Sequence, residues 1–214
     1  RGSNFLFTGN FEGTVFYPDM KGIEIINEDE DYVYVRVGAG EEWDRWVKWT
    51  VEHGYGGVEN LSLIPGHVGA SPVQNVGAYG MEAGDTIYRV EAIRLEKAEK
   101  VSIDAADCQF AYRDSIFKRE WKNQYLITRV VFRLTKEFRL DYGSVKSELE
   151  KMGQGISLQT VRQAIINIRN AKLPDVKVCP NAGSFFKNPV VSRELAEGLL
   201  KQYPGLPVYQ GDEE

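Results

Sequence analysis

The chain has few cysteines, and this limits the class of protein from which it can come. Its 214 residues include two, Cys108 and Cys179, which lie far apart in the sequence. Small secreted domains that depend on disulfides are dense in cysteine, so a disulfide framework is not indicated. A reducing compartment, the cytoplasm, fits this composition better.

Long apolar runs and an excess of basic residues are missing as well. No hydrophobic stretch is long enough to cross a bilayer, so no membrane partner is expected. The formal net charge of -5 argues against a general nucleic-acid binder, which would carry a basic face. An anionic small ligand remains compatible with this charge, because local lysines and arginines can form a positive pocket on an acidic protein.

The rest of the composition is that of an ordinary globular chain. Hydrophobic residues make up 43% and charged residues 27%, which is enough to bury a core. The first part of the chain is rich in strand patterns and the last part in helix patterns, and the change falls near residues 140–155. The sequence therefore predicts an α+β fold of two domains.

Five stretches carry the residues of β-strands. The strongest, Tyr32-Val33-Tyr34-Val35-Arg36-Val37, is β-branched and aromatic and is closed by glycines. Strands are expected at residues 14–17, 22–27, 32–37, 90–95 and 125–134. The acidic run at residues 28–31 is expected to form a solvated hairpin tip.

Three stretches repeat apolar residues at helical spacing. Helices are expected at residues 41–53, 157–172 and 192–203. The first places Trp43 and Trp46 on a buried face and ends before Gly54, and Ser157 is expected to cap the second. Three leucines of the third are expected to face inward: Leu195, Leu199 and Leu200.

Residues 62–80 form a stretch rich in glycine and small residues. Such a segment can bring backbone N–H groups close to a flat or phosphorylated ligand, and the amides of Gln74 and Asn75 could bond the edge of a ring. The pattern is neither a P-loop, since no Gly-Lys-Ser/Thr follows, nor the Gly-x-Gly-x-x-Gly fingerprint. From the residues alone, a structural turn and a ligand cradle both stay open.

Two further stretches combine reactive groups with small or aromatic residues. Asn181-Ala182-Gly183-Ser184-Phe185-Phe186-Lys187-Asn188-Pro189 places a hydroxyl, which both donates and accepts hydrogen bonds, between small and aromatic residues. Ala111-Tyr112-Arg113-Asp114-Ser115-Ile116-Phe117-Lys118 places an arginine beside an aspartate. Taken alone, the first could be a polar turn between helices and the second a surface ion pair.

These three stretches, in their order along the chain, resemble the bacterial UDP-N-acetylenolpyruvoylglucosamine reductases of the first, tyrosine-loop subtype. The resemblance covers nearly the whole chain. It implies a vanillyl-oxidase-type FAD-binding domain at residues 1–143, without its N-terminal segment, followed at 144–214 by part of an α+β substrate-binding domain. It also implies an internal fragment, which alone is expected to be inactive.

The resemblance implies an oxidoreductase of peptidoglycan precursor synthesis in a bacterial cytoplasm. Hydride passes from NADPH to FAD and then to the enolpyruvyl group of a UDP-sugar, giving UDP-N-acetylmuramate. Another flavin oxidoreductase on the same fold would share residues 62–80 but need not carry residues 184–188. A non-catalytic nucleotide-binding module would lack Arg113 and Ser184, and a purely structural domain would bind no ligand.

The resemblance also assigns roles to individual residues. The catalytic pair implied is Ser184, the proton donor, and Arg113, near the enolpyruvyl carboxylate. A glutamate expected beyond Glu214 would assist the serine. No metal is implied. The cofactor-binding residues implied are Ile64, Pro65, Gly66, Gly69, Ala70, Ser71, Gln74, Asn75, Gly77, Ala78, Tyr79 and Ile127. The substrate-binding residues implied are Tyr112, Tyr142, Arg169, Lys172 and Asn188.

Overall fold

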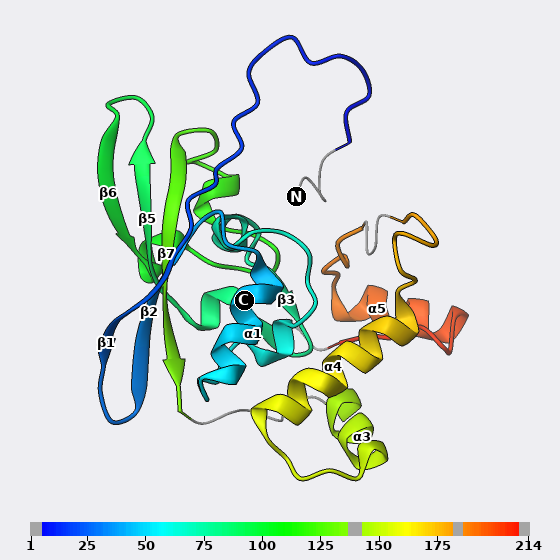
Figure 1. The fold of residues 1–214 in the computed structure, drawn as a ribbon. Coiled ribbons are helices and arrows are strands. Elements are labelled where there is room, and N and C mark those ends of the chain that lie inside the picture. The colour runs from blue at the N-terminus through cyan, green and yellow to red at the C-terminus, as the bar shows by residue number, and fades with distance from the viewer. Residues whose placement is uncertain (1–5, 137–142, 182–185, 210–214) are drawn as a thin grey trace. The chain divides into compact units, whose positions relative to one another are not determined.

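A computed structural model describes residues 6–136, 143–181 and 186–209. The chain divides into two compact units, Arg1–Asn181 and Ala182–Glu214. The first unit carries the sheet and most of the helices (Figure 1). The first unit extends past residue 143 and includes the helices that follow this residue. The predicted division into domains at residues 143 and 144 stays a prediction.

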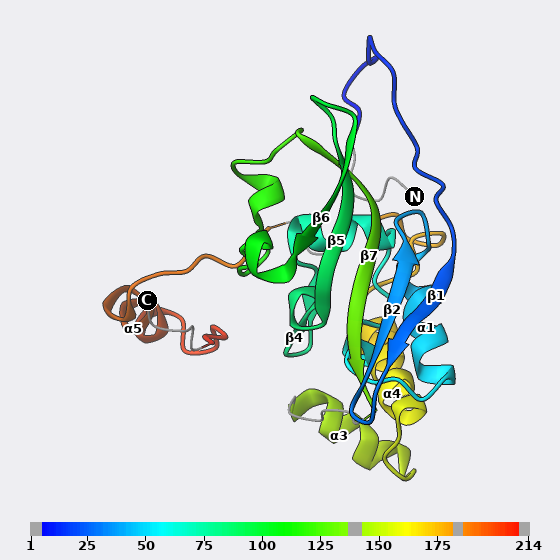
Figure 2. The same cartoon turned by 90° about the vertical axis from the view of Figure 1, so that its left-hand side faces the viewer.

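The centre of the first unit is a five-stranded antiparallel sheet (Figure 2). The first two strands pair as a hairpin, the next two form another, and the last strand lies between the hairpins and bonds both. In order across the sheet, the strands are β1 (Ile23–Glu28), β2 (Tyr32–Gly38), β7 (Tyr125–Thr135), β5 (Ile87–Arg94) and β6 (Glu99–Asp104).

Four longer helices and eight short elements complete the described chain. The longer helices are α1 (Trp43–Glu52), α3 (Gly143–Met152), α4 (Leu158–Lys172) and α5 (Arg193–Gln202). The short elements are η1 (Glu59–Leu61), η2 (Val68–Ala70), α2 (Ser71–Gln74), β3 (Gly77–Ala78), β4 (Met81–Glu82), η3 (Ala83–Asp85), η4 (Ala105–Cys108) and η5 (Ile116–Lys118). Among the described residues, no helix has the length and apolarity to span a membrane.

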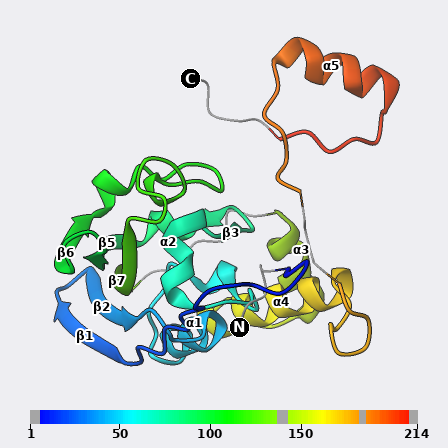
Figure 3. The ribbon, with the colours of Figure 1, turned by 90° about the horizontal axis from the view of Figure 1, so that it is seen from above.

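One face of the sheet is buried under α1 and the glycine-rich segment (Figure 3). Alternate residues of β2 are buried while those between them are half-buried or exposed, as expected for a sheet with one covered face. Trp43 and Trp46 of α1 are almost fully buried against Phe132 of β7, with ring centroids 6.0 and 5.2 Å apart. The core thus fixes α1 and the loop that follows it against the sheet.

The predicted helix boundaries are confirmed by the capping residues. Gly54 follows α1 with φ +78, a conformation that favours glycine. Ser157 caps α4: its hydroxyl accepts a bond from the N–H of Thr160, while the Thr160 hydroxyl accepts one from the N–H of Ser157. The apolar stripe of α4 packs against Val145 and Leu149 of α3.

Two predictions about local structure were wrong. Residues 14–17 form no strand; all four are exposed, and they pair with no strand in the described chain. The apolar residues of α5 are not buried, since Leu195 is 52% and Leu200 is 36% exposed. The helix itself forms as predicted, but none of its residues is buried.

Candidate functional site

The glycine-rich stretch folds into a series of short elements that lie on the end of β2 and on α1. Gly66 has φ +125, its C=O accepts a bond from the N–H of Trp43, and a Cβ at this position would have no atom within 4 Å. Gly69 lies so close to Ala39 that an added Cβ would approach the Ala39 Cβ to 2.6 Å. One glycine therefore leaves an open backbone surface, and the other permits close packing.

Asn75 ends α2 in the left-handed conformation, with φ 42, and its buried amide joins three segments. Its Nδ2 donates to Glu82 Oε2 at 2.5 Å and to the C=O of Ala111 at 3.0 Å. Its Oδ1 accepts a bond from the N–H of Gly84 at 2.8 Å. Both amide hydrogens are therefore engaged inside the protein, so this side chain shapes the loop.

Arg113 lies beside this amide and is held by three groups. Its Nη1 donates to Glu82 Oε1 at 2.8 Å and its Nη2 to the C=O of Gly77 at 2.6 Å. The guanidinium carbon also lies 4.9 Å from the ring centroid of Tyr112, a cation–π distance. The glycine-rich stretch thus contacts the predicted catalytic arginine directly.

Gly77 and Glu82 are matched to this arginine in size and charge. A Cβ on Gly77 would lie 2.5 Å from Arg113 Nη1 and 2.9 Å from Glu82 Cγ, so a side chain here would displace the guanidinium from its present position. Burial raises the pKa of Glu82, while the charge of Arg113 acts in the opposite direction. The pair combines a half-buried carboxylate and a half-buried cation.

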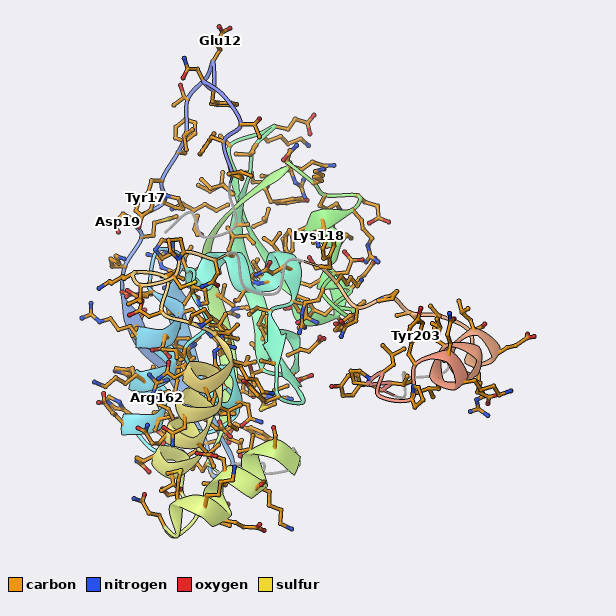
Figure 4. All side chains as sticks on the ribbon, turned by 90° about the vertical axis from the view of Figure 1, so that its right-hand side faces the viewer. Glu12, Tyr17, Asp19, Lys118, Arg162 and Tyr203 are labelled. Atoms are coloured by element: carbon orange, nitrogen blue, oxygen red, sulfur yellow. The ribbon has the colours of Figure 1, made fainter. Side chains whose placement is uncertain are left out.

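The segment that carries Arg113 is fixed at both ends. Ala111 and Asp114 exchange two backbone hydrogen bonds, of 3.1 and 3.0 Å, across a tight turn, and Arg113 within it has φ 55. The buried hydroxyl of Ser115 donates to the C=O of Val73, on α2, at 2.7 Å. Lys118, labelled in Figure 4, donates from Nζ to the C=O of Arg113 at 3.0 Å. The turn is therefore tied to the glycine-rich stretch.

Helix α4 meets the start of the same stretch through Asp44 of α1. Arg162 donates to both carboxylate oxygens at 2.7 and 2.9 Å, and the N–H of Leu63 donates to Asp44 Oδ1 at 2.5 Å. Burial alone would raise the pKa of Asp44, but these bonds outweigh burial and lower it. Arg169, one of the predicted substrate contacts, adds to the positive field on this carboxylate.

Residues 1–100 match a family described as FAD binding domain. The UDP-N-acetylenolpyruvoylglucosamine reductase of Bacteroides fragilis is 51% identical over 213 residues, which are 99% of this chain and 64% of that relative. The same enzyme of Bdellovibrio bacteriovorus is 49% identical over 207 residues, 96% of this chain and 62% of the relative. The chain is therefore similar to these reductases over nearly its whole length.

The chain spans less than two thirds of the length of these reductases. The solved structure of the UDP-N-acetylenolpyruvylglucosamine reductase of Thermus caldophilus is 23% identical, with a TM-score of 0.49, and covers 77% of this chain and 53% of that one. The match to the FAD binding domain confirms the predicted fold class and the prediction of FAD as cofactor.

The structure brings part of the predicted reductase site together. Of the predicted cofactor residues, Asn75 and Gly77 meet Arg113 around Glu82, and the Tyr112 ring lies against Arg113. Tyr79 packs against the buried cluster formed by α3 and α4. Helix α4 also carries Arg169 and Lys172. Arg169 is half-buried and Lys172 is exposed.

Other predicted residues lie elsewhere. Ile127 is buried in the core of the sheet, at 8% exposure, and Ser71 is buried with its hydroxyl donating to the C=O of Val68. Asn188 is exposed in the second compact unit. Ser184 and Tyr142 lie outside the described residues. All these roles stay predictions.

Sequence reasoning missed Glu82 and the structural role of Asn75. A signal was present, because Asn75 and Glu82 frame the Gly77-Ala78-Tyr79-Gly80 turn of the resembled motif, but a lone carboxylate after a turn has many uses. A surface hollow in the described part of the chain is lined by none of the predicted residues. It is lined by Asp85, Thr86, Ile87, Tyr88, Asp104, Ala105, Ala106 and Arg133.

Proposed function

We propose that the protein containing this chain reduces UDP-N-acetylglucosamine enolpyruvate to UDP-N-acetylmuramate, with NADPH as the source of hydride. The observation that carries the proposal is the guanidinium of Arg113, which is held by Gly77 and Glu82 within the glycine-rich stretch. A planar guanidinium with N–H groups to spare suits the carboxylate of an enolpyruvyl group. The similarity to reductases of this name supports the same reaction.

The glycine-rich stretch has features that fit FAD. Gly66 leaves its backbone open on one side, where a flat ligand can approach. Ile64, Val73, Val76 and Ala78 are apolar and half-buried, as the face of an isoalloxazine ring requires. We propose that the cofactor is held without a covalent bond by this stretch, which carries most of the cofactor residues expected from the family.

The chemistry assigned to this chain's own residues is binding, charge stabilisation and proton delivery. FAD, once bound and reduced by NADPH, would supply a hydride to the terminal vinyl carbon. Arg113 binds the substrate carboxylate and stabilises the negative charge that spreads onto it as the hydride adds. The Ser184 hydroxyl delivers a proton to the neighbouring carbon, so the double bond is reduced while NADPH is oxidised to NADP⁺.

The remaining substrate contacts follow from the family pattern. We propose that Tyr112 and Tyr142 contact the UDP-sugar and that Arg169, Lys172 and Asn188 contact its charged and polar groups. Arg169 and Lys172 lie three residues apart at the end of α4, where cations are also favoured by the helix dipole. We place the reaction in peptidoglycan precursor synthesis in the cytoplasm, with residues 144–214 contributing to the substrate-binding domain.

The test uses the full-length protein. It is reduced anaerobically with NADPH, mixed with UDP-N-acetylglucosamine enolpyruvate, and followed by flavin absorbance while the product is identified by mass. We expect rapid return of the flavin band and a product two hydrogen atoms heavier than the substrate. UDP-N-acetylglucosamine, which lacks the enolpyruvyl group, is the matched control and should leave the flavin reduced.

Another flavin oxidoreductase on the same fold would be reduced without responding to this substrate. A nucleotide-binding module would bind the UDP-sugar but would not be reduced by NADPH. Either result would overturn the proposed function.

A further inference from the structure

The guanidinium of Arg113 is oriented by a support that the family pattern of catalytic residues does not contain. Two of its five N–H groups are engaged by Glu82 Oε1 and by the C=O of Gly77, and the Tyr112 ring lies against it. These contacts hold one edge of the planar group. Its other N–H groups are left to bind a ligand.

Glu82 is itself held at both oxygens. While Oε1 accepts from Arg113, Oε2 accepts from Asn75 Nδ2 at 2.5 Å. Its backbone N–H donates to Asp85 Oδ2 at 2.8 Å, and its side chain accepts in return from the N–H of Asp85. The carboxylate therefore cannot rotate without breaking bonds to three neighbours.

Asn75 carries this support into the backbone. Its amide bonds the C=O of Ala111 and the N–H of Gly84, so it connects the turn that carries Arg113 with the segment that carries Glu82. The arginine, the glutamate and the amide thus belong to one network built from three chain segments. Networks of this kind fix the direction of a group that must meet a ligand at a set angle.

We infer that Glu82, supported by Asn75, is the positioning residue that aims the Arg113 guanidinium at the carboxylate of the ligand. Glu82 acts through Arg113 and makes no contact with the reacting atoms. The inference rests on the proposed function, because that function supplies a ligand carboxylate for Arg113 to bind. It adds a residue whose loss should affect recognition of the carboxylate while leaving recognition of the nucleotide intact.

The chain offers a matched control pair. Arg36 Nη2 lies 2.9 Å from Glu91 Oε2 across β2 and β5, and the two side chains are 32% and 19% exposed. The corresponding values for Arg113 and Glu82 are 2.8 Å, 32% and 29%. Glu91→Gln therefore removes an ion pair of the same kind and exposure from the sheet, where no role in binding is proposed.

The first measurement is ligand binding by calorimetry on the full-length holoprotein, which needs no turnover. The ligands are UDP-N-acetylmuramate, which has the carboxylate, and UDP-N-acetylglucosamine, which lacks it. Glu82→Gln should weaken binding of the first roughly tenfold and leave the second within about twofold, since a displaced guanidinium loses one charge-assisted bond. Glu91→Gln should change neither.

The second measurement separates the half-reactions. Glu82→Gln should slow flavin reoxidation by substrate roughly 10- to 100-fold, the loss expected from a misplaced catalytic group. Reduction by NADPH should stay within about twofold of wild type. Glu82→Asp keeps the charge, but its shorter side chain should give an intermediate slowing and a partial loss of carboxylate binding.

The outcomes separate this inference from the function on which it rests. If the wild-type protein is not reoxidised by the enolpyruvyl substrate, the proposed function fails. If the wild type is active and Glu82→Gln and Glu82→Asp weaken both ligands equally, or neither, the positioning role is overturned and the function stands. A general packing role predicts such an equal loss, accompanied by a lower melting temperature.

Discussion

Arg162 on α4 donates two hydrogen bonds to Asp44 on α1, with N–O distances of 2.7 and 2.9 Å. The two residues are 118 positions apart, and both side chains are less than one quarter exposed. The same carboxylate accepts the N–H of Leu63, at the start of the glycine-rich stretch. One ion pair therefore joins α1, α4 and the loop predicted to hold the cofactor.

We expect Asp44→Asn to destabilise the fold by about 1–3 kcal/mol near neutral pH, because the half-buried Arg162 loses its charged partner. Bonds from Arg162 and Leu63 place the folded-state pKa of Asp44 below its ordinary value, so in acid the folded state binds fewer protons than the unfolded state. The contribution is full above the unfolded value of about 3.9 and is lost as pH falls through the folded pKa. Urea unfolding of wild type and variant across this range measures the difference.

Glu52→Gln is the control for this prediction. It neutralises the exposed Lys48–Glu52 pair on the same helix, where both side chains are more than half exposed and solvent screens the charges. A difference between wild type and Asp44→Asn that stays constant from pH 7 to acid would contradict the role of the Asp44 charge.

The fold was largely predictable where local pattern and burial agree. The alternation along β2 and the serine cap of α4 both have local causes, so residues 32–37 and 157–172 were read correctly. Helix α3 was missed because its apolar stripe of Val145, Leu149 and Met152 is short and lies among charged residues. The spacing of the leucines predicted helix α5 but not the exposure of these side chains. Burial depends on a partner surface, which the local sequence does not contain.

The site was predictable as a set of motifs and not as a network. Arg113 and Gly77 were each assigned from their own stretch, but nothing local indicated that the guanidinium would lie on this glycine. Glu82 lies 31 positions before Arg113, and the pair forms because the turn at Ala111 is tied to Asn75. Such contacts depend on the tertiary fold, so position-by-position reading of the sequence could not supply them.

Arg113→Lys should be a poor replacement in the full-length protein. The two Nη groups reach Glu82 and the C=O of Gly77 together, and a single ammonium cannot reproduce this planar arrangement. We expect the reaction with the enolpyruvyl substrate to slow by about 10²-fold, while reduction by NADPH is unaffected. Stopped-flow absorbance measures both steps.

Arg119→Lys is the matched control for this substitution. Arg119 lies six positions on, is 39% exposed, and pairs with Asp114 at 3.3 Å. Its replacement should leave both half-reactions within about twofold of wild type. An Arg113→Lys protein that behaves like this control would remove Arg113 from the site.

The two cysteines should differ sharply in reactivity. Cys108 is fully buried, and burial raises the pKa of its thiol to about 12, so only about one molecule in 10⁴ is a thiolate at pH 8. Cys179 is exposed. Iodoacetamide at pH 8 should label Cys179 in the native protein and Cys108 only after unfolding, as read by peptide mass spectrometry. Labelling of Cys108 at a comparable rate would show that the core around η4 opens readily.

Ser184→Ala tests the proposed proton donor, although Ser184 lies outside the described residues. The substitution barely changes side-chain volume, so a packing role predicts only a small loss of stability. A role as general acid predicts that reoxidation by substrate slows by about 10²–10⁴-fold with NADPH reduction intact. Ser184→Cys should retain more activity than Ser184→Ala, since a thiol still donates a proton. Reoxidation of Ser184→Ala within about threefold of wild type would return the residue to the role of a polar turn.

Gly77→Ala tests whether the arginine site needs the space that this glycine leaves. The new Cβ would lie 2.5 Å from Arg113 Nη1 and 2.8 Å from the C=O of Met81. The guanidinium can move away, but the Met81 carbonyl is backbone paired within β3 and β4, so strain there is unavoidable. We expect a loss of about 1–3 kcal/mol in the free energy of unfolding. We also expect binding of UDP-N-acetylmuramate to weaken more than binding of UDP-N-acetylglucosamine.

Gly155→Ala, where the added Cβ meets no atom within 4 Å, should leave both properties unchanged or slightly raise stability. If Gly77→Ala matches Gly155→Ala in urea unfolding and in calorimetric binding of both ligands, the close approach of Gly77 to Arg113 has no part in holding the guanidinium.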